Sequence, residues 1–167
     1  MCDSPTVAVH LLADRPDLVV PVARLRWQEW GTEPGRQDLR WWIDVTGSEA
    51  GRTAPHVAFV AVSEADEAVG AVSIAPADLP ERPALSPWVV GMIVQADRRG
   101  SGIGGALMSA LQQWAAVSGI SRLWVATGGP AVEFYRRCGW TVAEVLDRDN
   151  GEQATILTVR PGEPTRS

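Results

Sequence analysis

The sequence predicts a single α/β (α+β) domain, in which residues 1–160 form the domain and residues 161–167 a C-terminal tail. Three observations lead to this prediction. The length of 167 residues is typical of one domain that buries a substantial core. Strand-like and helix-like segments follow one another along the whole chain. No internal repeat or low-complexity linker divides it.

The expected elements follow from apolar patterning and turn residues. Short apolar runs bounded by turn residues predict strands at residues 6–12, 56–62, 68–74, 87–94, 122–127, 140–146 and 154–160. Apolar residues at helical spacing predict helices at residues 14–30, 35–47, 102–117 and 130–138. Pro21 leaves two options, because an interior proline lacks a backbone donor: the first helix begins near Pro21, or a short turn precedes a kink. The strands between residues 56 and 94 are expected to run antiparallel, and the last two strands to form a hairpin around Asn150 and Gly151.

Composition narrows the classes of function. The formal net charge of -5 argues against a general binder of nucleic acid or anionic membranes, which usually presents a basic face. All 15 basic side chains are arginine, so Schiff-base chemistry and the lysine of a P-loop are excluded. Cys2 and Cys138 are the only thiols, too few for a disulfide framework or a four-ligand zinc site, and no metal is expected. Because no signal sequence or spanning apolar run is present, we expect a cytoplasmic protein.

A glycine-rich loop, "RRGSGIGGAL" at residues 98–107, joins a predicted strand to a predicted helix. Unsatisfied N–H groups at a helix start, together with the helix dipole, favour an anion such as a phosphate or pyrophosphate. The same glycines would also suit a tight turn with a surface arginine pair. A dinucleotide fingerprint is matched by Gly100, Gly102 and Gly105, but residues 95–99 separate these glycines from the strand. The next strand also carries no acidic residue that could bind a ribose. The remaining interpretation of the loop as a phosphate-binding motif is the pattern Arg99-x-x-Gly102-x-Gly104.

Two linked motifs carry a resemblance to a known family. "VVGMIVQADRRGSGIGGALM" and "GPAVEFYRRCGW" resemble the acyl-CoA signature and the second signature of the GNAT superfamily of acyltransferases. The resemblance covers most of the chain, from Thr6 to Arg160. It implies a mixed, mostly antiparallel central sheet of about seven strands with flanking helices. That sheet is expected to be splayed, forming a cofactor cleft, where strand 89–95 parts from strand 122–127.

The resemblance also implies roles for individual residues, with acetyl-CoA as co-substrate. Main-chain groups of Met92, Ile93 and Val94 would bind the pantetheine arm. The pyrophosphate would lie on a cradle formed by Arg99, Gly100, Ser101, Gly102, Ile103 and Gly104. Tyr135, the only tyrosine, lies where the family often has a general acid, and a phenol with an ordinary pKa of about 10 stays protonated at neutral pH. One position departs from the pattern: Gly128 stands where many members have an asparagine that contacts the cofactor.

The acceptor is expected to bind in the N-terminal half, to Trp27, Trp30 and Glu29, because aromatic rings and carboxylates suit a cationic amine. A small amine-bearing molecule is the predicted acceptor. Two alternatives are a protein or peptide N-terminal amine and a non-catalytic acyl-CoA-binding module. The chain is expected to be a monomer or homodimer, without a nucleic-acid or membrane partner. Candidates for the general base are Glu29, Glu33 and Asp44.

Overall fold

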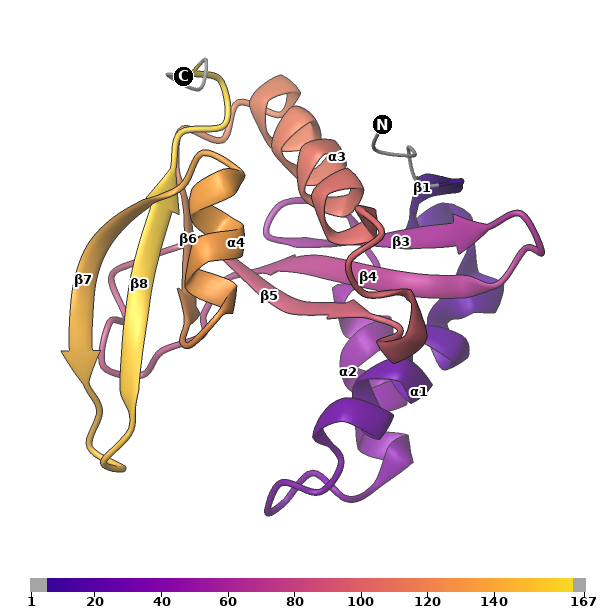
Figure 1. The fold of residues 1–167 in the computed structure, drawn as a ribbon, viewed down its shortest axis with the longest axis horizontal. Coiled ribbons are helices and arrows are strands. Elements are labelled where there is room, and N and C mark those ends of the chain that lie inside the picture. Colours follow the sequence, from indigo (N-terminus) through magenta and orange to yellow (C-terminus); the bar gives the residue numbers. More distant parts are fainter. Residues whose placement is uncertain (1–5, 164–167) are drawn as a thin grey trace.

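A computed structural model describes residues 6–163. Its sheet has eight strands, seven of them in the order β1-β3-β4-β5-β6-β8-β7, and β2 pairs with β3 at its side. Figure 1 shows the strands with the helices around them. The strands are β1 (Val7–Leu11), β2 (Arg52–Thr53), β3 (His56–Ser63), β4 (Ala68–Ala75), β5 (Trp88–Val94), β6 (Leu123–Thr127), β7 (Thr141–Asp147) and β8 (Gln153–Val159). The α-helices are α1 (Val19–Trp30), α2 (Leu39–Glu49), α3 (Ile103–Val117) and α4 (Ala131–Arg137).

The sheet consists of two antiparallel parts that meet at one point. The first part runs from β1 through β3 and β4 to β5, and the second contains β6, β8 and β7. The two parts join through β5 and β6, which are parallel and pair only between Trp88 and Trp124. This arrangement confirms the mixed, mostly antiparallel sheet and its splaying between these two strands.

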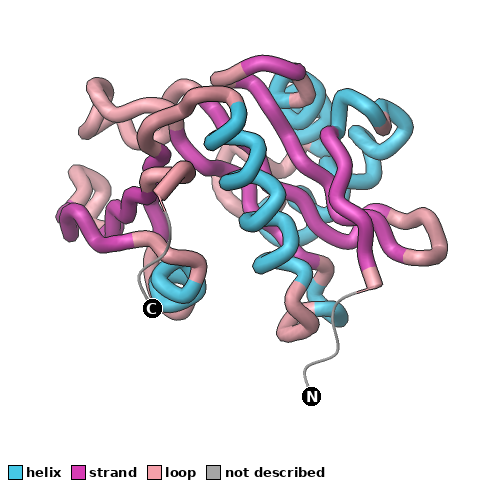
Figure 2. The backbone as a smooth tube through the Cα atoms, turned by 90° about the horizontal axis from the view of Figure 1, so that it is seen from above, coloured by secondary structure: helices cyan, strands magenta, loops and turns pink. Residues whose placement is uncertain are grey.

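Helices cover both faces of the first part of the sheet. On one face, Val57 and Phe59 of β3 pack with Leu107 and Met108 of α3. On the other face, Val60 of β3 packs with apolar residues of the α1 region. Figure 2 shows α3 on one side of these strands and the α1–α2 pair on the other. Because β3 is buried on both faces, its sequence is a continuous apolar run rather than an alternating one.

The expected elements are present, with small differences at their ends. Short 3-10 turns, Leu12–Asp14 and Pro16–Leu18, precede α1, which begins two residues before Pro21. Proline is tolerated there because N–H groups in a helix's first turn have no intrahelical partner. The hairpin of β7 and β8 is also confirmed, whereas the two-residue strand β2 had no clear sequence signal. Among residues 6–163, no helix is long and apolar enough to cross a membrane. Cys2 and residues 164–167 of the predicted tail lie outside the described residues.

Candidate active site

The open edge of β5 is the centre of the candidate site. Beyond the Trp88–Trp124 pair, the residues of β5 have no ladder partner on β6. Met92 and Val94 pack toward the core cluster that contains α3, and Ile93 is buried on the α1 side. Along the edge that faces the gap between the two parts of the sheet, the strand therefore has backbone groups without a partner strand.

The glycine-rich loop connects β5 to α3. Gly100 and Gly102 have φ angles of +81° and +89°, a left-handed conformation that glycine adopts without penalty. Gly102 caps α3, and no side chain caps the N–H groups of the first turn. Ile103 is buried in the core and fixes the start of the helix. At Gly104 an added Cβ would lie 3.2 Å from the ring of Phe134, so this glycine permits close packing of α3 against α4.

Arg99 connects the loop to its surroundings, and Ser101 makes a contact within the loop. Arg99 Nη2 donates to Glu29 Oε2 of α1 at 2.8 Å, and Arg99 Nε donates to the carbonyl of Val94 at 3.2 Å. The hydroxyl of Ser101 donates to the carbonyl of Arg98. Arg99 and Glu29 are both about half exposed, so their ion pair contributes little stability but holds the loop near α1.

β5 contains a one-residue bulge within the candidate site. Ala71 and Ser73 of β4 are two residues apart, but their partners Ile93 and Val90 on β5 are three apart. The extra residue lies at Gly91, whose φ is +63°. A bulge of this kind redirects the side chains that follow it and is common beside active sites.

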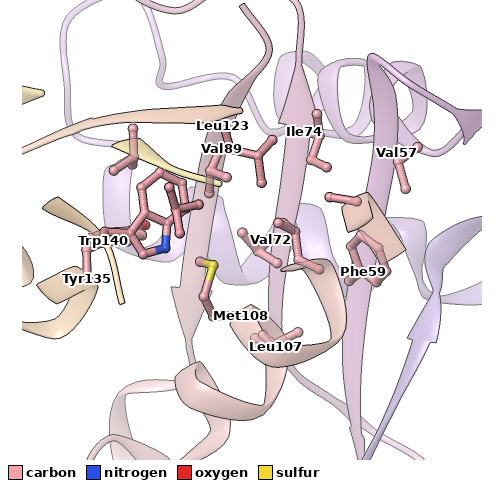
Figure 3. Close-up of a cluster of buried hydrophobic side chains, with 14 of the residues drawn as sticks. Val57, Phe59, Val72, Ile74, Val89, Leu107, Met108, Leu123, Tyr135 and Trp140 are labelled. Carbon is pink, nitrogen blue, oxygen red and sulfur yellow. The ribbon is translucent and has the colours of Figure 1, made fainter. Parts of the chain in front are cut away.

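Tyr135 lies on α4, close to the core. Its side chain is 4% exposed and packs edge-on against Phe134 and Trp140. Figure 3 shows Tyr135 and Trp140 together at one end of the core cluster. Burial raises the pKa of Tyr135, so the phenol stays protonated at neutral pH. Cys138, at the end of the same helix, is half-buried against the core, and burial raises the pKa of its thiol.

A second candidate region is a cavity of about 430 Å³ between the α1–α2 pair and the sheet. Val90 and Gly91 of β5 form part of its wall. Three tryptophans line it, with Trp30 stacked on Trp42 at 6.0 Å and Trp41 packed edge-on against Trp42 at 4.8 Å. A volume of this size suits a small molecule.

Charges in this cavity nearly cancel. Glu33 pairs with Arg36 at 3.1 Å, and Glu49 pairs with Arg26 at 2.8 Å. Asp78 makes no hydrogen bond or ion pair with the other described side chains and leaves the cavity one negative charge in excess. Desolvation by neighbouring protein atoms raises the pKa of Asp78, against the opposing effect of Arg148 and Arg36.

The structure separates the residues predicted to bind the acceptor. Trp30 and the base candidate Glu33 line the cavity, but Trp27, Glu29 and Asp44 do not. Trp27 Nε1 donates instead to the carbonyl of Gln37, which supports the loop between α1 and α2. Sequence reasoning missed Glu49 and Asp78 as residues of this cavity. For Asp78 a signal was present, because a carboxylate in the proline-rich loop that follows a predicted strand is a candidate site residue.

Comparison with known proteins gives a consistent family assignment. The model of the acetyltransferase (GNAT) family matches residues 18–140. An aminoglycoside 6'-N-acetyltransferase complexed with coenzyme A has a TM-score of 0.74 at 16% identity, over 96% of this chain and 99% of that chain. An acetyltransferase assigned to the GNAT family from Desulfovibrio desulfuricans has a TM-score of 0.72 at 20% identity, over 93% and 99%. A spermidine N-acetyltransferase chimera, in part from Vibrio cholerae, has a TM-score of 0.72 at 13% identity, over 93% and 96%. No curated protein matches the sequence significantly.

Proposed function

The chain belongs to the GNAT family of acetyltransferases, and from that premise we propose that it transfers the acetyl group of acetyl-CoA to an amine of a small cationic acceptor. The observation that carries this proposal is the position of β5. One end of its open edge leads to the uncapped start of α3, and its bulge forms part of the wall of the tryptophan-lined cavity. A single strand therefore connects an anion-binding loop to a small-molecule cavity.

The cofactor is proposed to lie along this strand. Backbone groups of Met92, Ile93 and Val94 would bind the pantetheine arm as a neighbouring strand does, and the residues from Arg99 to Gly104 would bind the pyrophosphate. The uncapped N–H groups and positive dipole end of α3 suit a diphosphate. In support, the similar aminoglycoside 6'-N-acetyltransferase is complexed with coenzyme A.

The acceptor is proposed to bind in the tryptophan-lined cavity. Arg36 lies over the rings of Trp41 and Trp42 at 5.7 and 6.0 Å, which shows that these indoles stabilise a positive charge beside them, and Trp41 remains 39% exposed. The excess negative charge of Asp78 favours a positively charged acceptor. Two structural neighbours are named as aminoglycoside and spermidine N-acetyltransferases, which supports the same class of acceptor.

Two side chains are proposed to move protons during transfer. The neutral amine nitrogen attacks the thioester carbonyl carbon, and the C–S bond breaks. Asp78 accepts the proton released by the amine, because the other two carboxylates of the cavity are paired with arginines. Tyr135, whose phenol is protonated at neutral pH, donates its proton to the departing sulfur.

The proposal is tested by binding and transfer together. Calorimetric titration with acetyl-CoA, run beside NADH, should show binding of acetyl-CoA alone. Release of CoA should then be measured with aminoglycosides, polyamines and peptides bearing a free N-terminus. Acetyl-CoA binding without transfer to any amine would favour a non-catalytic binding module, and preference for peptides would overturn the small acceptor.

Tyr135→Phe is expected to lower kcat by about 10²-fold or more, as typical for loss of a general acid. Affinity for acetyl-CoA should change little, because the substitution removes only the hydroxyl and keeps the ring that packs against Phe134 and Trp140. Steady-state rates and calorimetry on the same preparation measure both quantities. An unchanged kcat would contradict the acid role.

Gly128→Asn is expected to strengthen acetyl-CoA binding by about threefold to tenfold, the value of one net hydrogen bond. The position can accept a side chain, because an added Cβ would lie 3.9 Å from the carbonyl of Gln153, an ordinary contact. Gly128→Ala provides the control, since it adds the Cβ without the amide. Equal affinities of the two variants would show that the missing asparagine does not limit binding.

A further inference from the structure

Arg26 is the charged residue buried most deeply in the described part of the chain. Its side chain is 2% exposed, although Arg24 and Trp27 on the same helix are exposed. It occupies the inward stripe of this region at helical spacing, four residues after Val22, which is fully buried against the sheet. A guanidinium in this position is costly to desolvate and needs partners for its donors.

Four hydrogen bonds connect this guanidinium of α1 to helix α2 and to the strands β4 and β5. Nη1 donates to Thr46 Oγ1 at 3.2 Å and to Glu49 Oε1 at 2.8 Å, both on α2. Nη2 donates to Ser73 Oγ of β4 at 2.9 Å, and Nε donates to the carbonyl of Gly91 on β5 at 3.3 Å. The contact with Gly91 is so close that an added Cβ there would lie 2.6 Å from Nη2.

Gly91, whose carbonyl accepts from Arg26, is also the residue at which the side chains of β5 switch faces of the sheet. Val89, before the bulge, packs on the α3 side. In a regular strand Ile93, four residues later, would lie on the same face. Ile93 instead packs on the α1 side, because the extra residue at Gly91 shifts the alternation by one. The bulge therefore determines how the following residues of β5 meet the open edge.

Packing alone does not require a charge at this position. A buried ion pair is often no more stabilising than apolar side chains of similar volume. A regular strand at this place would have no bulge, and so would not need a hydrogen bond from Arg26 to restrain one. A planar guanidinium, by contrast, binds several acceptors in fixed directions. Through Arg26, the observed contacts connect the Gly91 carbonyl to two side chains of α2 and one of β4, which restrains the bulge against its neighbours.

We propose that Arg26 is a positioning residue for acetyl transfer, which holds the Gly91 carbonyl and thereby fixes the bulge of β5 against the acceptor cavity. The proposal rests on the proposed function, because it assigns the bulge a part in aligning the acetyl group with the acceptor. Arg26 acts through the backbone of β5. The pyrophosphate loop lies beyond the far end of the strand and is not among its contacts.

Arg26→Met tests this role, with Arg24→Met, an exposed arginine on the same helix, as the matched control. We expect Arg26→Met to lower kcat by about 10²-fold, the size of effect that a displacement of about 1 Å can cause. The Kd for CoA, measured by calorimetry, should change by less than about threefold, which is a small change in binding free energy because a tenfold change in Kd corresponds to about 1.4 kcal/mol. Arg24→Met should leave both quantities unchanged. A normal kcat in a folded Arg26→Met protein would overturn the proposal.

Two further variants keep the test decisive if Arg26→Met fails to fold. Ser73→Ala removes one acceptor but leaves the Arg26–Glu49 pair, and it should lower kcat by about threefold to tenfold, the value of one net hydrogen bond, with unchanged CoA affinity. Arg26→Lys keeps the charge without the planar fork and should be as impaired as Arg26→Met. Full activity of the lysine variant would overturn the proposal, since charge alone would then suffice. Failure of the unmodified protein to bind acetyl-CoA would instead overturn the proposed function.

Discussion

Gly102→Asp is expected to abolish measurable acetyl-CoA binding. Two effects act in the same direction at this position. The φ of +89° strains any residue with a Cβ, at a cost of about 1–2 kcal/mol. A carboxylate at the N-cap of α3 would also occupy the N–H groups proposed for the pyrophosphate and repel its negative charge. Calorimetry with acetyl-CoA, together with the thermal midpoint, measures binding and folding separately.

Gly119→Asp provides the matched control for strain and charge. Gly119 follows the C-terminal end of the same helix, has a φ of +79°, and has open space around an added Cβ. This variant should lose at least as much stability, because a carboxylate is unfavourable at the C-terminal end of a helix, but it should bind acetyl-CoA normally. Equal loss of binding in both variants would show that damage to α3, and not the site at its start, explains the effect of Gly102→Asp.

Most of the fold could be predicted because its core elements have strong local patterns. The predicted strand at residues 56–62 and the helix at 102–117 correspond to β3 (His56–Ser63) and α3 (Ile103–Val117). Continuous apolar runs and helical spacing dominate these segments, so tertiary contacts reinforce the local preference. The glycine-rich loop could also be recognised from local sequence, because its left-handed backbone conformation at residues 100 and 102 favours glycine.

The acceptor side was harder to predict because its chemistry depends on contacts distant in sequence. Arg26 follows Val22 at helical spacing, yet a lone charge on a helix is typical of an exposed face. Its partners come from residues 20 to 65 positions away, a separation that no local pattern encodes. Trp27 and Trp30 look equivalent in the sequence, but only Trp30 lines the cavity.

The loop that carries Asp78 is anchored by contacts of the same long-range kind. Leu79, the next residue, is buried beside Trp88 of β5 and Ile156 of β8. Arg148 Nε donates to Glu81 Oε2 at 2.9 Å, and an ion pair between Arg82 and Glu144 ties the loop to β7. These contacts fix both ends of a short segment next to Asp78, so a proline-rich stretch without helix or strand can still present a carboxylate at a defined place.

Asp78→Asn is expected to lower kcat/KM by about 10²-fold or more, as typical for loss of a general base. The amide has nearly the same shape as the carboxylate but cannot accept the amine proton at neutral pH. Asp44→Asn, on the exposed face of α2 and outside the cavity, is the matched control and should retain full activity. Rates measured with the most active amine acceptor compare the three proteins directly.

The pH dependence gives a sharper test of the same role. A base acts only when deprotonated, so activity should fall as the pH drops through the pKa of Asp78. Desolvation raises that pKa, which places the fall above the ordinary aspartate value of about 3.9. The midpoint should stay at one pH for two acceptors whose amine pKa values differ, and this limb should vanish in Asp78→Asn. A midpoint that moves with the acceptor amine and persists in the variant would assign the titration to the substrate and remove Asp78 from the reaction.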